Sequence, residues 1–260
     1  MLTLELANGL SKGDDPIASD PAQLMVAAGM QPDPWQAALL QSDWQRALLL
    51  CSRQAGKSTA TGALATHTAI YQPGSLTLLL SAAQRQSGEL FNTVKGFYRS
   101  LPQAPAVAQE SALQMMLTNG SRIIALPGKE ATIRGYAGVD LLVIDEASRV
   151  PDELYFSVRP MLAVSGGRLI CLTTPFGKRG FFHQEWTEGG DEWHRTKITA
   201  NDVPRISPEF LEAERRAMGE WWFSQEYMCE FVETTDQVFS YDLIQEAMSS
   251  DVQPLFGGIK

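Results

Sequence analysis

Residues 47–59 read Ala-Leu-Leu-Leu-Cys-Ser-Arg-Gln-Ala-Gly-Lys-Ser-Thr, an apolar run followed at once by a glycine-lysine-serine turn. Gly56, Lys57 and Ser58 match the last three positions of the phosphate-binding loop pattern GxxxxGK[ST]. Cys51 stands where that pattern has its first glycine. Backbone N–H groups at the start of the following helix can still surround phosphate oxygens. The stretch therefore predicts a P-loop, with an ordinary helix start as the alternative interpretation.

Short apolar runs bounded by turn residues recur along the chain and alternate with helical patterns. We predict strands at 47–50, 76–80, 141–144 and 168–173. We predict helices at 23–30, 35–41, 58–71, 84–100, 152–163, 208–218 and 220–231. Asn119-Gly120 predicts a hairpin between 114–117 and 121–125. Strand–helix alternation of this kind predicts an α/β fold, with a parallel central sheet covered by helices on both faces.

Acidic and hydroxyl side chains follow two of the predicted strands. Asp145 and Glu146 come directly after the run at 141–144, where an open α/β sheet places its ligands. Asp145 is suited to hold Mg²⁺ through water, and Glu146 to act as general base on an attacking water. Thr173 and Thr174 end another strand, where hydroxyls beside a terminal phosphate can sense its loss. A solvated acidic turn and a plain strand end are the alternatives.

Composition limits the class of protein. The formal net charge of −9 argues against a protein coated in positive charge, although a local basic strip remains compatible with DNA binding. The three cysteines lack CxxC spacing and are expected to be reduced and mostly buried, and the three histidines show no zinc-ligand spacing. Neither a signal peptide nor a membrane span is expected.

Three segments together resemble the ATPase domain of the large terminase subunit of tailed bacteriophages. They are SRQAGKST at 52–59, IRGYAGVDLLVIDEA at 133–147 and LTTPFGKRGFFHQEW at 172–186, and the resemblance extends over roughly residues 30–240. A serine-arginine-glutamine ahead of the glycine-lysine-serine is a distinctive P-loop form in that family, so Cys51 fits it. The resemblance implies an additional-strand P-loop ATPase with a small C-terminal helical lid.

The resemblance also implies roles for individual residues. Lys57 and Arg53 would contact phosphate, Glu146 would activate water, and Arg134 would act as an arginine finger in the site of a neighbouring subunit. Ser58 and Asp145 would hold Mg²⁺, and Thr173 and Thr174 would couple hydrolysis to DNA movement. The expected ATP contacts are Gln36, Ser52, Arg53, Gln54, Ala55, Gly56, Lys57, Ser58 and Thr59. Alternatively, Arg53 links to a neighbouring subunit.

Two of these assignments keep a second interpretation. The Gln36 amide can donate and accept together, which suits the adenine edge, but the residue also fits the surface of a helix. Arg134 also fits a solvated loop. A set of basic residues has two interpretations, as contacts to DNA or as scattered solubilising charge. The set comprises Lys95, Arg99, Arg122, Lys129, Lys178, Arg179, Arg205, Arg215 and Arg216. The pairs Phe181-Phe182 and Trp221-Trp222 suit a core or an interface better than base stacking.

The expected domain organisation is an N-terminal lead-in at 1–22, an ATPase core at 23–198, a lid at 199–240 and a tail at 241–260. The expected partners are double-stranded DNA, a homomeric ring of five subunits, a portal protein and a small terminase subunit, in the host cytoplasm. No membrane contact is expected. The nuclease domain usual in that family is not expected in this chain, so DNA cleavage is not expected either.

Two other functions remain open. A helicase-like translocase would share the P-loop and the Asp-Glu pair. A nucleotide-binding assembly module with negligible turnover would share the P-loop, although Glu146 directly after Asp145 speaks against it.

Overall fold

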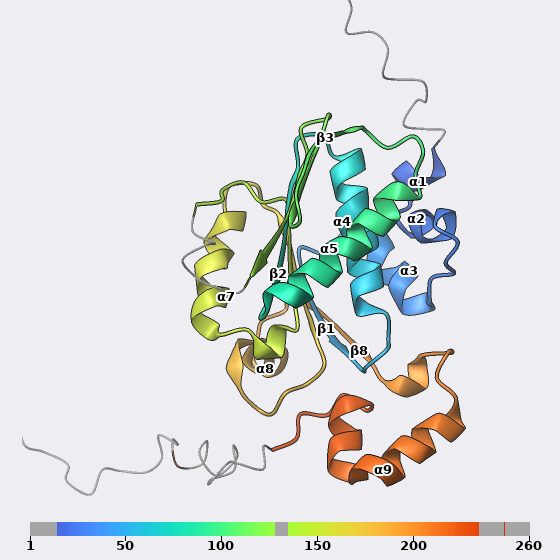
Figure 1. Cartoon of the computed structure of the whole chain (residues 1–260). Helices are drawn as coiled ribbons and strands as arrows, with labels where there is room; N and C mark the ends of the chain where they lie inside the picture. The colour runs from blue at the N-terminus through green and yellow to red at the C-terminus, as the bar shows by residue number, and fades with distance from the viewer. Residues whose placement is uncertain (1–14, 128–134, 234–246, 248–260) are drawn as a thin grey trace, which may run out of the picture.

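The computed structural model of the chain describes residues 15–127, 135–233 and 247. In these residues the strands are β1 (Arg46–Cys51), β2 (Leu76–Ser81), β3 (Val107–Glu110), β4 (Gln114–Leu117), β5 (Arg122–Pro127), β6 (Leu141–Asp145), β7 (Arg168–Thr173) and β8 (Trp193–Ile198). They form one sheet in the order β3-β4-β5-β2-β6-β7-β1-β8 (Figure 1). In this order, the neighbouring strands from β5 through β8 pair in parallel, whereas β4 pairs antiparallel with both β3 and β5 at one edge of the sheet. The predicted α/β fold with a parallel central sheet is confirmed.

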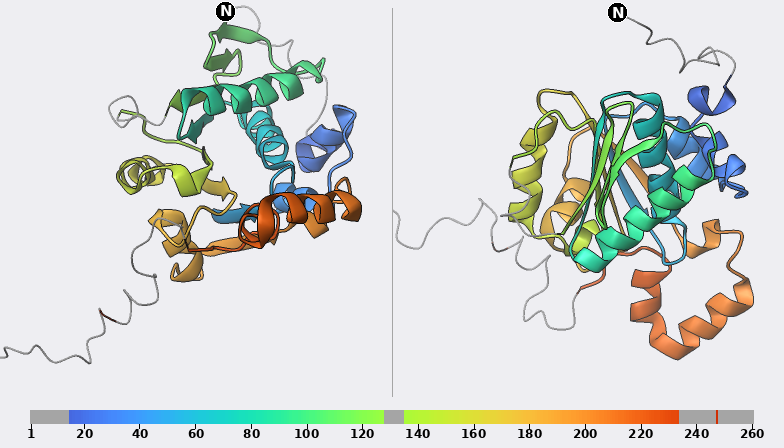
Figure 2. Two further views of the ribbon diagram at one scale, coloured as in Figure 1. Left: turned by 60° about the horizontal axis from the view of Figure 1, so that its bottom comes forward. Right: turned by 45° about the horizontal axis from the view of Figure 1, so that its top comes forward.

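Helices cover both faces of the sheet (Figures 1 and 2). One face carries α1 (Pro16–Ser19), α2 (Ala22–Ala27), α3 (Pro34–Gln41), α4 (Lys57–Tyr71) and α5 (Gln84–Arg99). The other face carries α7 (Asp152–Val158) and α8 (Gly180–Thr187). The described residues also form the short 3-10 helices η1 (Ala147–Arg149), η2 (Arg159–Leu162) and η3 (Ala200–Asp202). The last long helix, α9 (Pro208–Glu226), lies beyond the edge of the sheet that β8 forms.

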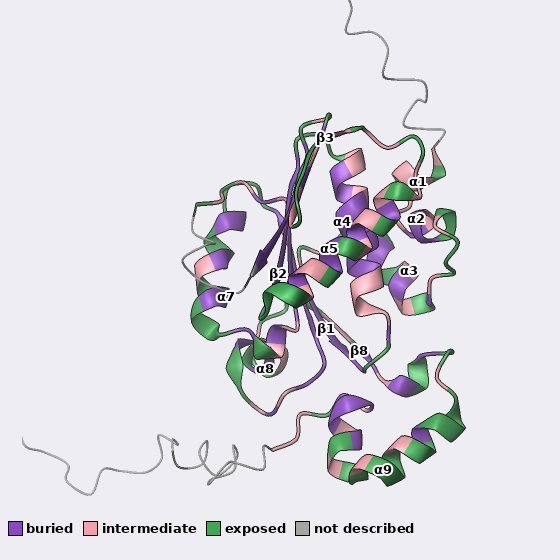
Figure 3. Ribbon diagram, in the orientation of Figure 1, coloured by how far each residue is buried: buried purple, intermediate pink, exposed green. Residues whose placement is uncertain are grey.

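Alternate residues of each central strand point to opposite cores. Leu49 and Cys51 of β1 pack in the cluster under α4 and α5, whereas Leu48 and Leu50 pack in the cluster under α7 and α8. Both clusters are nearly sealed from solvent, as the purple central strands show in Figure 3. The two-sided burial explains why these strands are continuous apolar runs.

Several predicted element boundaries differ from the structure. The helix predicted at 152–163 ends at Val158 and continues as η2, because Pro160 has no N–H for an α-helical bond. The helices predicted at 208–218 and 220–231 form α9, which breaks at Gly219 with φ of 79° and ends at Glu226. Their separation at Gly219 is confirmed, whereas the predicted end at 231 is wrong.

The sequence patterns missed α1, α8, β3 and β8. The lead-in predicted at 1–22 lies mainly outside the described residues, but its end forms α1 and packs on α4. The Tyr71 hydroxyl donates to the Asp15 carboxylate over 2.7 Å. Strand β8 escaped the sequence patterns because it is an edge strand, buried only at Trp193 and Ile198. In the part of the chain that is described, no helix is both long and apolar enough to cross a bilayer.

Candidate nucleotide-binding site

The P-loop connects β1 to α4, and its geometry depends on a glycine. Gly56 immediately precedes α4 with φ of 87°, which favours glycine. A Cβ on Gly56 would lie 2.7 Å from Nε2 of Gln36, so a larger residue would displace that side chain. Cys51, by contrast, is the last residue of β1 and is fully buried. Cys51, which takes the place of the first glycine of the P-loop pattern, is therefore part of a regular strand, where no glycine is required.

The strand order brings the two predicted motifs together. β7 lies between β1 and β6, which is the extra strand of an additional-strand P-loop fold. Asp145 ends β6 and is only 7% exposed. The Ser58 hydroxyl donates a hydrogen bond to the Asp145 carboxylate, and the charge of Lys57 also acts on that carboxylate. Lys57, Ser58 and Asp145 therefore converge at one place.

Burial perturbs the Asp145 carboxylate. Its pKa is raised from 3.8 to about 6, first by burial and then by the negative charge of Glu146. Lys57, the Glu146 N–H and the Ser58 hydroxyl act in the opposite direction. A buried carboxylate with too little compensating positive charge is suited to a cation.

Glu146 follows Asp145 in an unusual backbone conformation. Its φ is 52°, and its N–H donates to Oδ1 of Asp145 over 2.9 Å. This turn sends the Glu146 side chain into an open cleft of about 400 Å³, hereafter the phosphate cleft. The residues lining the phosphate cleft are Arg53, Gln54, Lys57, Gln86, Glu146, Arg149, Thr174 and Glu226.

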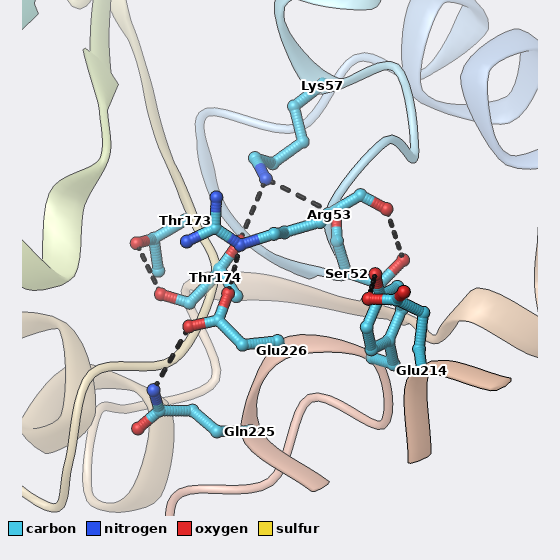
Figure 4. Close-up of polar contacts among 9 residues, drawn as sticks. Ser52, Arg53, Lys57, Thr173, Thr174, Glu214, Gln225 and Glu226 are labelled. Carbon is cyan, nitrogen blue, oxygen red and sulfur yellow. Dashed lines mark hydrogen bonds and ion pairs between the residues drawn. The ribbon is translucent and has the colours of Figure 1, made fainter. Parts of the chain in front are cut away.

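The two threonines at the end of β7 contact both motifs. Nζ of Lys57 donates to Oγ1 of Thr174 over 3.1 Å (Figure 4). Oγ1 of Thr173 accepts from the Ser148 N–H over 3.3 Å and donates to the Thr174 carbonyl over 2.8 Å. The end of β7 therefore joins the P-loop lysine to the loop that follows Glu146.

Arg53 contacts the C-terminal helix. Its Nε forms an ion pair with Oε2 of Glu226 (Figure 4), and its backbone N–H donates to the Glu226 carbonyl over 3.1 Å. The Arg53 pKa is raised by the hydrogen bond to Glu226. Glu226 is 7% exposed and was not singled out in the sequence, because α9 is distant along the chain and only tertiary folding brings it to the P-loop.

A second pocket, of about 750 Å³, lies across the P-loop from the phosphate cleft; Gln54 lines both. We call it the base pocket. Its lining residues are Met25, Met30, Gln31, Pro32, Asp33, Pro34, Gln36, Gln54, Gly56, Thr59, Pro204 and Arg205. Gln36 is 3% exposed, so the surface-glutamine interpretation is wrong. Its Oε1 accepts from the Asp33 N–H over 2.8 Å, and its Nε2 donates to the Gly56 carbonyl over 3.1 Å.

Two predicted residues, Arg134 and Lys129, lie outside the described residues. The finger assignment of Arg134 therefore stays a prediction. Among the candidate DNA contacts that the structure describes, Lys95, Lys178, Arg205 and Arg215 form ion pairs with other described residues of the chain. Phe181 and Phe182 are buried in the core as predicted, whereas Trp222 is 49% exposed.

The fold and the site define an additional-strand P-loop protein with two pockets that adjoin at Gln54 of the P-loop. A family model described as "Terminase large subunit, T4likevirus-type, N-terminal" matches residues 48–246. The chain therefore belongs to the terminase large subunit family. A search of curated proteins found no match.

Solved structures share the fold. The large terminase ATPase domain of Thermus phage P74-26 matches with a TM-score of 0.72 and 22% identity, covering 82% of this chain and 99% of that one. The HK97 bacteriophage large terminase matches with a TM-score of 0.64 and 14% identity, covering 78% of this chain and 51% of that one. A large terminase from a thermophilic bacteriophage, solved with ADP, has a TM-score of 0.62 and 16% identity, covering 82% of this chain and 53% of that one. The chain thus spans about half of these two longer proteins.

Proposed function

We propose that this chain is a Mg²⁺-dependent ATPase that drives double-stranded viral DNA into a capsid. The observation that carries the proposal is the convergence of Lys57, Ser58 and Asp145, with Lys57 and Glu146 lining the phosphate cleft. Membership of the terminase family supports the packaging role.

The two pockets suggest how ATP lies on the protein. With its base in the base pocket and its phosphates in the phosphate cleft, the nucleotide crosses the P-loop at Gln54. Gln36 still has one N–H and one acceptor lone pair beyond its two protein hydrogen bonds, which suits the adenine edge. The remaining predicted contacts from Ser52 to Thr59 surround the phosphates through the loop and the start of α4.

Two residues next to those that line the phosphate cleft fit Mg²⁺. The Asp145 carboxylate and the Ser58 hydroxyl are oxygen donors, the class of ligand that Mg²⁺ prefers, and the carboxylate is buried without full charge compensation. When bound, the ion would neutralise charge on the phosphates.

Hydrolysis then depends on two groups of the chain. Glu146 accepts the proton of the attacking water, while Lys57 stabilises negative charge on the phosphates. ATP and water become ADP, phosphate and a proton. Lys57 binds phosphate in place of Thr174, its partner in the structure, so the end of β7 is released or held according to the state of the nucleotide.

The motor role needs neighbouring subunits. We infer a homomeric ring, of five subunits when assembled, in which Arg134 enters the site of the adjacent subunit. The further partners are a portal protein and a small terminase subunit, and the motor assembles with them in the host cytoplasm. In this organisation residues 23–198 form the motor core, 199–240 the lid, and 241–260 a tail. ATPase activity per subunit should rise with protein concentration, and a constant specific activity would contradict the finger in trans.

Phosphate release by wild type and by Glu146→Gln tests hydrolysis. The variant keeps the size and hydrogen-bonding capacity of the side chain but cannot accept the proton, so we expect a fall in turnover of about 10²–10⁴-fold with ATP binding retained. Equal rates would favour the non-hydrolysing assembly module instead.

A helicase-like translocase is the second candidate. A DEAD-box protein from Methanococcus jannaschii shares the fold with a TM-score of 0.52 and 13% identity. A packaging motor moves along duplex DNA without separating its strands. ATP-dependent strand displacement by this chain would therefore favour the helicase-like function.

A further inference from the structure

The base pocket has a wall contributed by the segment between β8 and α9. Pro204 and Arg205 of this segment line the pocket together with Pro34 and Gln36 of α3. The segment follows η3 and leads directly into α9, whose last residue, Glu226, pairs with Arg53. The C-terminal helical part therefore reaches the P-loop on both sides, through Glu226 at the phosphate cleft and Arg205 at the base pocket.

Arg205 is held in place by a buried acid. Its Nη1 forms an ion pair with Oδ1 of Asp33, whose side chain is 7% exposed, while the Arg205 side chain is 52% exposed. The Asp33 N–H in turn donates to Gln36. Asp33 therefore connects Gln36, the residue expected to read the base edge, with the Arg205 cation.

The guanidinium also lies close to the P-loop. Nη2 of Arg205 is 3.7 Å from the position that a Cβ on Gly56 would occupy, and Nε2 of Gln36 is 2.7 Å from that same position. The Arg205 and Gln36 side chains thus stand side by side over Gly56 at the inner end of the base pocket. A planar guanidinium with one nitrogen bound to a carboxylate keeps its face free to stack on a purine.

We propose that Arg205 is a base-binding residue that stacks on the adenine ring of bound nucleotide, while Asp33 fixes its guanidinium in the stacking position. This inference rests on the proposed nucleotide-binding function. Its consequence is that an occupied base pocket adds a contact between the nucleotide and the segment leading into α9. An empty pocket leaves that segment attached through the Asp33 ion pair and through the packing of Val203 and Ile206 on the core.

Isothermal titration with two ligands tests the proposal. MgADP carries the base, whereas magnesium tripolyphosphate occupies only the phosphate cleft. We expect Arg205→Ala to weaken MgADP binding on the order of tenfold, the size of a lost cation–π contact at a partly exposed site, and to leave tripolyphosphate binding unchanged. Arg205→Lys keeps the charge but loses the planar face, so it should recover little of the lost affinity.

The matched control is Arg216→Ala, which removes an exposed arginine from α9 and should leave both affinities unchanged. Asp33→Asn should weaken MgADP binding less than Arg205→Ala, because the guanidinium remains but is no longer fixed. Unchanged MgADP affinity in Arg205→Ala, an equal loss for both ligands, or full recovery by lysine would each overturn the stacking role. Wild-type protein that binds neither ligand would instead refute the proposed function itself.

Discussion

Asp145→Asn should make the protein more stable at neutral pH, even though it removes a residue of the proposed site. Burial and the charge of Glu146 raise the Asp145 pKa from 3.8 to about 6. The folded state therefore holds this proton more tightly than the unfolded state, and stability falls as pH rises from the unfolded value through about 6. A difference of roughly 2 pKa units corresponds to about 3 kcal/mol of unfolding free energy at neutral pH. Asparagine does not ionise and can still bond to Ser58.

Thermal unfolding with EDTA and without nucleotide measures this effect. At about pH 7.5 the variant should unfold roughly 5–10 °C above wild type, and the difference should shrink as pH falls and vanish only well below the unfolded-state pKa of 3.8, where Asp145 is protonated in both states. Mg²⁺ should raise the melting temperature of wild type only. The control is Asp191→Asn, at an exposed position, which should have little effect at either pH. An equal or lower melting temperature for Asp145→Asn at pH 7.5, or a difference independent of pH, would refute the reasoning.

Three further predictions concern packing and reactivity. Gly167→Ala should lower the free energy of unfolding by about 2 kcal/mol or more, because the new Cβ would lie 1.9 Å from the Val139 carbonyl oxygen. Gly96→Ala on α5, where a Cβ meets open space, is the control and should be neutral or stabilising by about 0.5–1 kcal/mol in the same urea unfolding assay. Tyr155→Phe should lower stability by about 1 kcal/mol in the same assay, because its hydroxyl donates to Glu185 over 2.7 Å, and no change would contradict this. Iodoacetamide at pH 8 should label Cys51, Cys171 and Cys229 far more slowly in the native protein than in the urea-unfolded protein, because burial raises the pKa of these thiols and shields them. Mass spectrometry measures the labelling, and rapid labelling of the native protein would contradict the prediction.

Local patterns in the sequence were sufficient for the central strands and for the residues at their ends. Strands such as β2 and β6 are buried on both faces, so their runs are continuously apolar and easy to recognise. Lys57 and Ser58 follow one strand, and Asp145 and Glu146 follow another, so their types and spacing already indicated a phosphate and magnesium site. Even the departure at Cys51 agreed with the terminase family.

Tertiary structure alone decided the partners of these residues. The sequence could not show that β7 lies between β1 and β6, because strand order depends on the crossovers and not on local pattern. Nor could it join Arg53 to Glu226 or Asp33 to Arg205, since each pair is separated by more than 170 positions and no local period connects them. Short-range periodicity fixes which residues face a core or end a strand, whereas folding of the whole chain fixes which distant charges meet across the P-loop.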